Sequence, residues 1–299
     1  MGINMFGNMR TDLAAEMHEL LGGGELEGVK SAQESYENIH ISRIQVLNEA
    51  GAKHLGKPVG LYVTVQAPPF GGNIDASFEE IELIAKEVAA MLPQSPQLVL
   101  VAGLGNRSIT PDALGPDTAG QILATRHISK EIAQAAGLGE LRAVAAVAPG
   151  VLGQTGVETG EIIASIVKSI KPSAVIVVDA LAAKSIERLG CTIQISDVGI
   201  VPGSGVSNAR KALNRETLGI PVIAVGVPTV VDAATLAVDL MQTEDKATID
   251  KVTPRGAAMM VTPREVDIMI ERAAKVLSLA LNKALQPEMA LEDIQMLVG

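Results

Sequence analysis

AVIVVDALAA, at Ala174–Ala183, is the stretch that decides the fold. Its first half is an uninterrupted run of Ala, Val and Ile, and Pro172 and Ser173 precede it. A short apolar run bounded in this way is typical of an interior strand of a parallel sheet. We therefore expect a strand at residues 174–178, with Asp179 directly at its carboxyl end. In an open α/β sheet, ligands bind in the crevice beyond these strand ends.

A second apolar run, also followed by an aspartate, lies nearer the N-terminus. Residues 97–116 read QLVLVAGLGNRSITPDALGP, and residues 97–102 predict a strand that leads through a glycine-containing turn to Asp112. Asp112 and Asp179 would then lie at the same edge of one sheet. Two carboxyl groups that meet in a crevice can share one proton, so that one acts as a base and the other as an acid. Such a pair suits water-mediated hydrolysis of a peptide bond, whereas each aspartate alone could be a helix cap or a turn residue.

Strand and helix patterns alternate over most of residues 59–241. Further strands are expected at residues 59–65, 142–148, 192–195 and 221–227. Helices are expected at residues 13–21, 77–91, 117–136, 159–170, 182–188, 232–241, 263–284 and 289–298. This alternation predicts one α/β domain with a mostly parallel, twisted sheet, helices on both faces and extra elements near both ends. The polar segment 243–260 is expected to be a surface excursion.

Composition and charge exclude several classes of function. The chain has 299 residues, of which 47% are hydrophobic and 19% charged, so a sizeable core can form. Aromatic residues make up only 2%, which argues against base-stacking platforms for single-stranded nucleic acid. The formal net charge of −10 would repel a polyanion such as DNA. We therefore expect no direct nucleic-acid partner.

Cysteine usage and targeting signals indicate an intracellular protein. Cys191 is the sole cysteine, which excludes an internal disulfide and a cysteine-rich zinc site. The N-terminus, MGINMFGNMRTDLAAE, lacks the charged and apolar regions of a signal peptide. No stretch approaches the roughly 18 strongly apolar residues that a membrane span needs. We expect a cytoplasmic protein with no membrane partner.

Two weaker signals leave alternatives open. GLGN at residues 103–106 could belong to the nucleotide loop of an oxidoreductase, but Ser108 stands where the G-x-G-x-x-G fingerprint needs its last glycine. A tight turn is the better interpretation. His127, expected on the helix at residues 117–136, could approach Asp112 and Asp179 as a third metal ligand. The four histidines show no metal-ligand spacing, so a surface histidine is favoured and a metal-dependent peptidase is the alternative.

Long motifs of the chain together resemble the germination protease family of endospore-forming bacteria. The matching stretches, which cover most of residues 10–285, are RTDLAAE (10–16), GLGNRSITPDALGP (103–116), TRH (125–127), APGVLGQTGVETGEII (148–163), KPSAVIVVDALAAKSIERLGCTIQISDVGIVPGSGVSNAR (171–210), GIPVIAVGVPTVVDA (219–233) and MVTPREVD (260–267). The resemblance implies an atypical aspartic endopeptidase whose fold is similar to that of hydrogenase maturation proteases.

The resemblance also implies site residues and partners. The family's proposed catalytic acids lie in motifs that match PDALGP and VDALAA, which places them at Asp112 and Asp179. In the maturation proteases, acids at similar positions bind nickel together with a histidine, whereas the spore protease is not known to need a metal. The resemblance therefore implies no metal or other cofactor. It also implies that the substrates are small acid-soluble spore proteins and that the protein is a homotetramer in the cytoplasm of the developing spore core.

The family is made as a zymogen that is trimmed at its N-terminus. Its substrates are cut after Glu in a motif resembling Thr/Ser-Glu followed by Phe or Ile and then Ala-Ser-Glu. Residues 11–16, TDLAAE, place an acid, a bulky apolar residue, two alanines and a glutamate in the same order. We expect cleavage between Asp12 and Leu13, which would remove residues 1–12 as a propeptide and leave residues 13–299 as the peptidase domain. The alternatives are that Thr11 or Asp12 only caps the following helix, and that the whole chain is a non-catalytic module that grips a peptide.

Overall fold

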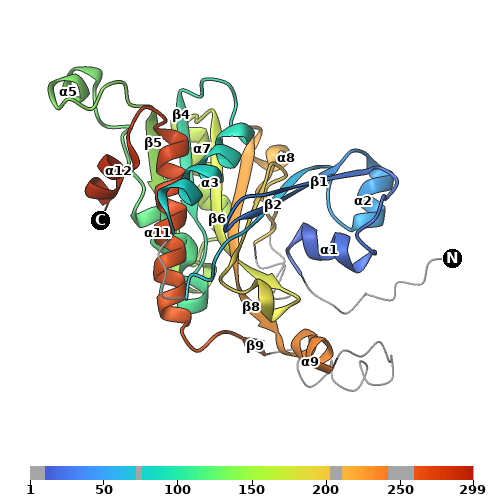
Figure 1. The fold of residues 1–299 in the computed structure, drawn as a ribbon. Coiled ribbons are helices and arrows are strands. Elements are labelled where there is room, and N and C mark those ends of the chain that lie inside the picture. The colour runs from blue at the N-terminus through green and yellow to red at the C-terminus, as the bar shows by residue number, and fades with distance from the viewer. Residues whose placement is uncertain (1–10, 72–75, 203–210, 242–258, 299) are drawn as a thin grey trace.

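A mixed nine-stranded sheet runs through the described part of the chain (Figure 1). The computed structural model describes residues 11–71, 76–202, 211–241 and 259–298. The strands are β1 (Val29–Ser35), β2 (His40–Val46), β3 (Gly60–Gln66), β4 (Leu98–Gly103), β5 (Ala143–Val147), β6 (Ala174–Ala183), β7 (Thr192–Ser196), β8 (Val222–Asp232) and β9 (Met260–Val261). The helices are α1 (Ala14–Leu20), α2 (Glu49–Leu55), α3 (Phe78–Met91), α4 (Leu114–Gly120), α5 (Lys130–Ala135), α6 (Leu152–Thr155), α7 (Thr159–Ile170), α8 (Arg215–Leu218), α9 (Ala233–Met241), α11 (Val266–Leu285) and α12 (Leu291–Val298), with short 3-10 turns η1 (Thr110–Asp112) and η2 (Ile186–Arg188).

The strand order explains where the parallel part of the sheet lies. The order is β1-β2-β3-β7-β8-β6-β4-β5, and β9 pairs with β8 off this path. The neighbours β5, β4, β6 and β8 run parallel to one another, whereas β1, β2, β3, β7 and β9 pair antiparallel. The α/β class is therefore confirmed. The sheet as a whole is mixed, because parallel pairing is confined to four of its strands.

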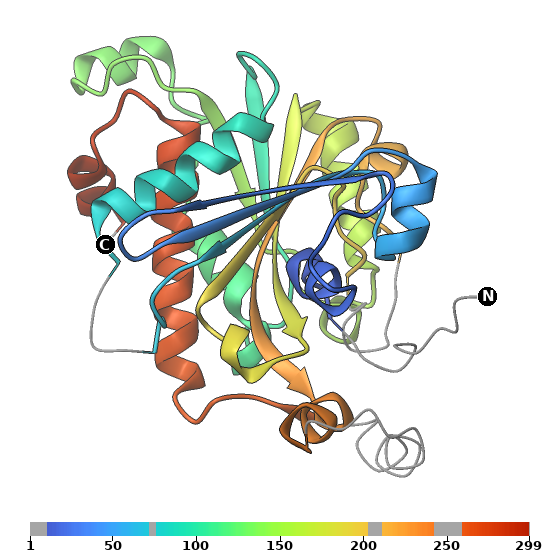
Figure 2. The ribbon, with the colours of Figure 1, turned by 45° about the vertical axis from the view of Figure 1, so that its right-hand side comes forward.

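Helices cover both faces of the parallel strands, as the sequence predicts. Side chains alternate along a strand, and in β6 Val175 and Val177 pack with Ile163 of α7 in one apolar cluster. Ile176 and Val178 belong to the cluster on the other face, which includes residues of α3 and α11. Figures 1 and 2 show α3 and α11 together on that face. Both faces of β6 are thus buried, which is why its sequence is apolar without alternation.

The helix at residues 77–91 is confirmed together with its start signal. The side chain of Ser77 accepts a hydrogen bond from the amide of Glu80, and the Glu80 carboxylate accepts one from the amide of Ser77. This capping box satisfies two of the amides that a helix start leaves without partners.

Among the described residues, no helix combines the length and the apolar character that crossing a bilayer requires.

The prediction of a helix at residues 182–188 is wrong. Strand β6 continues through Asp179 to Ala183, because Ala182 and Ala183 pair with Val230 and Val231 of β8 after a register shift. Only the short turn η2 follows. Alanine favours a helix locally, but the neighbouring strand provides hydrogen bonds that override this preference.

The long helix expected at residues 117–136 is also wrong, because it divides into α4 and α5. The segment between them lies along the edge strand β5, where the amide of Arg126 donates to the carbonyl of Val144 at 2.9 Å. The amide of Val144 in turn donates to the hydroxyl oxygen of Thr125 at 3.0 Å. The predicted surface excursion at residues 243–260 lies almost entirely outside the described residues.

Candidate active site

Asp112 is positioned by the turn that follows β4. After Gly103 the chain turns through Leu104, whose amide donates to the carbonyl of Val178 in β6 at 2.8 Å. The chain then returns through η1, and the Asp112 carboxylate accepts a hydrogen bond from the amide of Asn106 at 2.7 Å. Gly105 permits this approach: its φ is +118°, and a Cβ atom there would lie 2.1 Å from the carbonyl oxygen of Asp112. The structure therefore uses GLGN as a tight turn that holds Asp112.

Asp179 lies within β6 and not beyond its end. It pairs with Gly226 of β8, and only 7% of the residue is exposed. Its carboxylate accepts a hydrogen bond from the amide of Ala180 at 2.9 Å. The neighbouring residue of β8 is a glycine, and a Cβ at Gly226 would lie 2.7 Å from the carbonyl oxygen of Asp179. Close backbone packing thus fixes this carboxylate on a rigid strand.

The two aspartates, 67 positions apart in the sequence, line one cavity of about 300 Å³. Pro111 and Thr229 line the same cavity, and the Thr229 hydroxyl donates to the carbonyl of Pro111 at 2.8 Å. This bond ties η1, which carries Asp112, to β8. The structure thus brings Asp112 and Asp179 together, and Asp12 lines this cavity as well.

His127 lies elsewhere. It is an exposed residue in the turn between α4 and α5, so the prediction that it lies on a helix is wrong. It does not line the cavity of the two aspartates. Within the described ranges, no group of three or more His, Cys, Asp or Glu side chains is arranged to hold a metal ion. Cys191 is buried, and burial raises the pKa of its thiol.

The N-terminal segment is bound to the second half of β6. The amide of Asp12 donates to the carbonyl of Ala182 at 2.9 Å, and the amide of Ala182 donates to the Asp12 carboxylate at 2.9 Å. Leu13 is fully buried and packs with Leu181, Ala183 and Val231. The helix expected at residues 13–21 forms as α1, directly after Leu13. The peptide between Asp12 and Leu13 therefore sits beside the cavity of the two aspartates.

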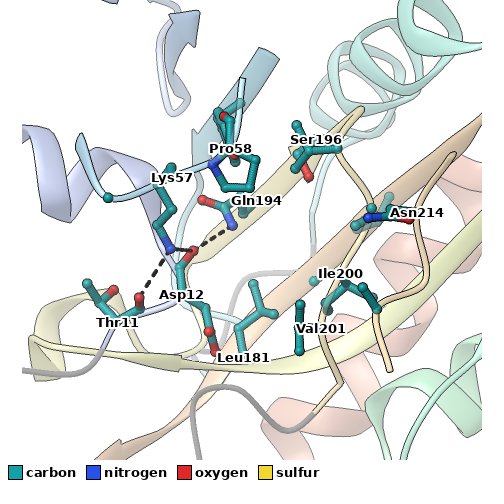
Figure 3. A pocket seen from close by; sticks show the side chains of 18 residues that line it. Thr11, Asp12, Lys57, Pro58, Leu181, Gln194, Ser196, Ile200, Val201 and Asn214 are labelled. Carbon is teal, nitrogen blue, oxygen red and sulfur yellow. Dashed lines mark hydrogen bonds between the residues drawn. The ribbon is translucent and has the colours of Figure 1, made fainter. Parts of the chain in front are cut away.

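Two side chains hold the carbonyl of Asp12 from a second cavity of about 440 Å³. The ammonium of Lys57 donates to this oxygen at 2.9 Å and to the carbonyl of Thr11 at 3.2 Å. The side-chain amide of Gln194 donates to the same Asp12 oxygen at 2.9 Å (Figure 3). The side-chain oxygen of Gln194 accepts from the amide of Ala14 at 2.7 Å. Burial lowers the pKa of the Lys57 ammonium, although the carboxylates of Asp12 and Glu16 oppose the shift.

Glu16 anchors the same segment further along. Its carboxylate accepts hydrogen bonds from the amides of Lys184 at 2.8 Å and Ser185 at 2.9 Å, and from the hydroxyl of Thr11. Only 3% of Glu16 is exposed. Sequence reasoning included Glu16 in the TDLAAE motif but missed Lys57 and Gln194. Lys57 follows α2 in a loop without a motif, and Gln194 lies on β7, so no local signal could have found either.

Comparisons with known proteins agree on one family. The family model described as germination protease matches residues 11–243. Germination protease of Caldanaerobacter subterraneus subsp. tengcongensis is 42% identical and covers 97% of this chain and 98% of its own length. Germination protease of Clostridium perfringens is 42% identical, with 96% and 98% covered, and that of a Geobacillus species is 38% identical, with 94% of each chain covered.

A solved structure gives a weaker likeness. The NiFe hydrogenase maturation protease HycI from Thermococcus kodakarensis aligns with a TM-score of 0.35 and 16% identity, over 63% of this chain and 94% of that one. The family model and the relatives, by contrast, span most of the sequence that carries the two aspartates, Lys57 and Gln194. The chain therefore belongs to the germination protease family.

Proposed function

We propose that this peptidase initiates the degradation of small acid-soluble spore proteins in the spore core, using Asp112 and Asp179 as its catalytic acids. It is made as a zymogen that cleaves itself between Asp12 and Leu13, so that residues 1–12 are a propeptide and residues 13–299 the peptidase domain. The supporting observation is that Asp12 lines the cavity that Asp112 and Asp179 share. The substrate class, the spore-core location and a homotetrameric assembly rest on the resemblance described above.

The proposed chemistry is general acid–base hydrolysis. One aspartate is ionised and takes a proton from a water molecule, whose oxygen attacks the carbonyl carbon of Asp12. The bond from this carbon to the nitrogen of Leu13 then breaks. The other aspartate starts protonated and either polarises the carbonyl or gives its proton to the leaving nitrogen. Because two close carboxyl groups titrate as a unit, the pair and not one residue carries the pH dependence.

The way in which the N-terminal segment is held supports its use as a substrate. Backbone groups of β6 hold Asp12, an apolar cluster encloses Leu13, and two backbone amides hold the carboxylate of Glu16. Ala14 and Ala15 between them are buried, at 0% and 5% exposed. These contacts thus suit a segment that has, in chain order, an acidic residue, a large apolar residue, two small residues and a second acidic residue. The cleavage motif of the family's substrates has a similar order.

Self-cleavage of the full chain tests this proposal. The purified chain, held at mildly acidic pH, is expected to yield a product that begins at Leu13, which intact-mass spectrometry identifies. Asp112→Asn and Asp179→Asn are each expected to abolish this product while the thermal unfolding curve stays close to that of the parent chain. Asp293→Asn, on the exposed side of α12, is the matched control and is expected to process normally. A different first residue would refute the proposed cleavage site, and full processing by either site variant would remove that aspartate from the mechanism.

A further inference from the structure

The carbonyl oxygen of Asp12 accepts two side-chain hydrogen bonds in a geometry suited to catalysis. Lys57 and Gln194 each donate to it at 2.9 Å. Donors that stabilise the oxyanion of a tetrahedral intermediate lie about 2.7–3.1 Å from the position of that oxygen. The two donors come from different parts of the fold, the loop after α2 and the strand β7. Their convergence on one peptide oxygen is visible in Figure 3.

The two cavities meet at Asp12. The cavity of Asp112 and Asp179 and the cavity of Lys57 and Gln194 share Asp12 in their linings, and they also share Leu181. Asp12 therefore lines the cavity of the two aspartates, while its carbonyl oxygen is held by two donors that line the other cavity. This division separates the groups that move protons from the groups that bind the oxygen.

We propose that Lys57 and Gln194 form the oxyanion-binding pair for cleavage of the bond between Asp12 and Leu13, an inference that rests on the proposed self-cleavage. When the water oxygen attacks the carbonyl carbon, the Asp12 oxygen gains negative charge. The Lys57 ammonium and the Gln194 amide stabilise that charge without moving, because both already donate to this oxygen. Charged donors form hydrogen bonds roughly twice as strong as neutral ones, so Lys57 contributes the larger share.

This assignment also gives the protonated aspartate its role. Since Lys57 and Gln194 polarise the carbonyl, the aspartic acid does not have to do so. Its proton goes to the nitrogen of Leu13 as the carbon–nitrogen bond breaks, and the ionised aspartate keeps the proton taken from water. The products are a carboxyl group on Asp12 and a free amino group on Leu13, so atoms and charges balance.

Gln194 additionally aligns the peptide for attack. Its side-chain oxygen accepts from the amide of Ala14 while its side-chain nitrogen donates to the carbonyl of Asp12. The two contacts bracket the bond between Asp12 and Leu13 from both sides. They also fix which end of the Gln194 amide is nitrogen, because an amide N–H can donate only to an oxygen and a carbonyl can only accept.

Replacement of the two donors tests the proposal in the full-length chain. Lys57→Met and Gln194→Leu each keep an extended side chain but remove the donor, and each is expected to slow self-cleavage by about 10²–10³-fold, the usual loss for one oxyanion donor. Lys53→Met, on the exposed surface of α2, is the matched control and is expected to process at the parent rate. If the parent chain releases residues 1–12 in a reaction that needs Asp112 and Lys57→Met keeps pace with it, the oxyanion pair is refuted and the proposed function stands. If the parent chain never releases them, both proposals fall.

A second measurement separates chemistry from docking. In an Asp112→Asn background, which cannot cleave, hydrogen–deuterium exchange of residues 11–20 reports whether the segment stays bound. We expect Lys57→Met to leave this protection unchanged, because Ala182, Gln194, Lys184 and Ser185 still hold the segment. Loss of protection would show that Lys57 only holds the segment in place and would overturn its role in binding the oxyanion.

Discussion

Gly105→Ala should disable the enzyme by displacing Asp112, although it replaces neither of the two proposed catalytic aspartates. Gly105 has a φ of +118°, a conformation that L side chains rarely adopt, and its new Cβ would lie 2.1 Å from the carbonyl oxygen of Asp112 and 3.1 Å from the Asp112 carboxylate. Backbone strain of this kind costs of order 1–3 kcal/mol. The clash with a backbone atom cannot be relieved by rotating a side chain, so η1 must move.

A matched substitution at Gly137 separates the effect of backbone strain from the effect of the steric clash. Gly137 also has a positive φ, +71°, but a Cβ there would meet nothing within 4 Å. Gly137→Ala therefore carries the conformational strain alone, about 1 kcal/mol. Gly105→Ala carries both, and we expect a loss of about 2–4 kcal/mol in the free energy of unfolding, within the range that overpacking and strain produce.

Two measurements test this prediction. Circular dichroism monitors unfolding in urea, and a separate assay measures the rate at which residues 1–12 are released. Movement of η1 lengthens the 2.7 Å hydrogen bond between the Asn106 amide and the Asp112 carboxylate. A misplacement of about 1 Å can cost 10²-fold in rate. We expect at least that loss for Gly105→Ala and a normal rate for Gly137→Ala. A normal rate in Gly105→Ala would refute the claim that this turn positions Asp112 for its proposed catalytic role.

Three further predictions concern the bound segment and the metal alternative. Glu16→Gln should lower the free energy of unfolding in urea by about 1–3 kcal/mol and slow self-cleavage, because it weakens the charged hydrogen bonds that the buried Glu16 carboxylate accepts from two backbone amides. Glu19→Gln, at an exposed ion pair with Arg188, should cost about 0–1 kcal/mol. Leu13→Ala should lower the free energy of unfolding by about 2–5 kcal/mol, since Leu13 is fully buried, and a loss no larger than that of Leu21→Ala at an exposed position would contradict the packing described. Exhaustive chelation should leave the rate of self-cleavage unchanged, and a rate restored only by added metal would favour the metal-dependent mechanism.

The sequence predicts those elements whose own residues carry the signal. The apolar runs of β4, β6 and β8 and the capping box of α3 depend on nearby residues, and all four form where they are expected. The β1–β2 hairpin gives no such signal, because β1 reads VKSAQES and most of it is exposed. Its pairing with β2 is determined by backbone hydrogen bonds and not by an apolar face, so its side chains show no alternation.

The candidate site divides in the same way. Asp112 and Asp179 could be selected because each follows an apolar strand, and strand ends meet at one edge of a parallel sheet. Lys57 and Gln194 meet only because β7 lies between β3 and β8 in the sheet, which is an antiparallel arrangement that the alternating pattern does not predict. The extension of β6 beyond Asp179 could not be predicted from the sequence either. A carboxylate inside a buried strand looks like a strand end until the partner strand and the bound N-terminal segment are known.

The bound segment also implies that cleavage alone does not open the site to a second polypeptide. On the proposed mechanism, cleavage frees Asp12 and so releases Lys57 and Gln194 for a new carbonyl. Leu13 and Glu16, however, remain attached to α1, where the apolar cluster and the amides of Lys184 and Ser185 hold them. A substrate with the same order of residues needs these positions. On the proposed function, such a substrate must displace the new N-terminus, and the strength of the hold on Glu16 then limits cleavage of a second polypeptide.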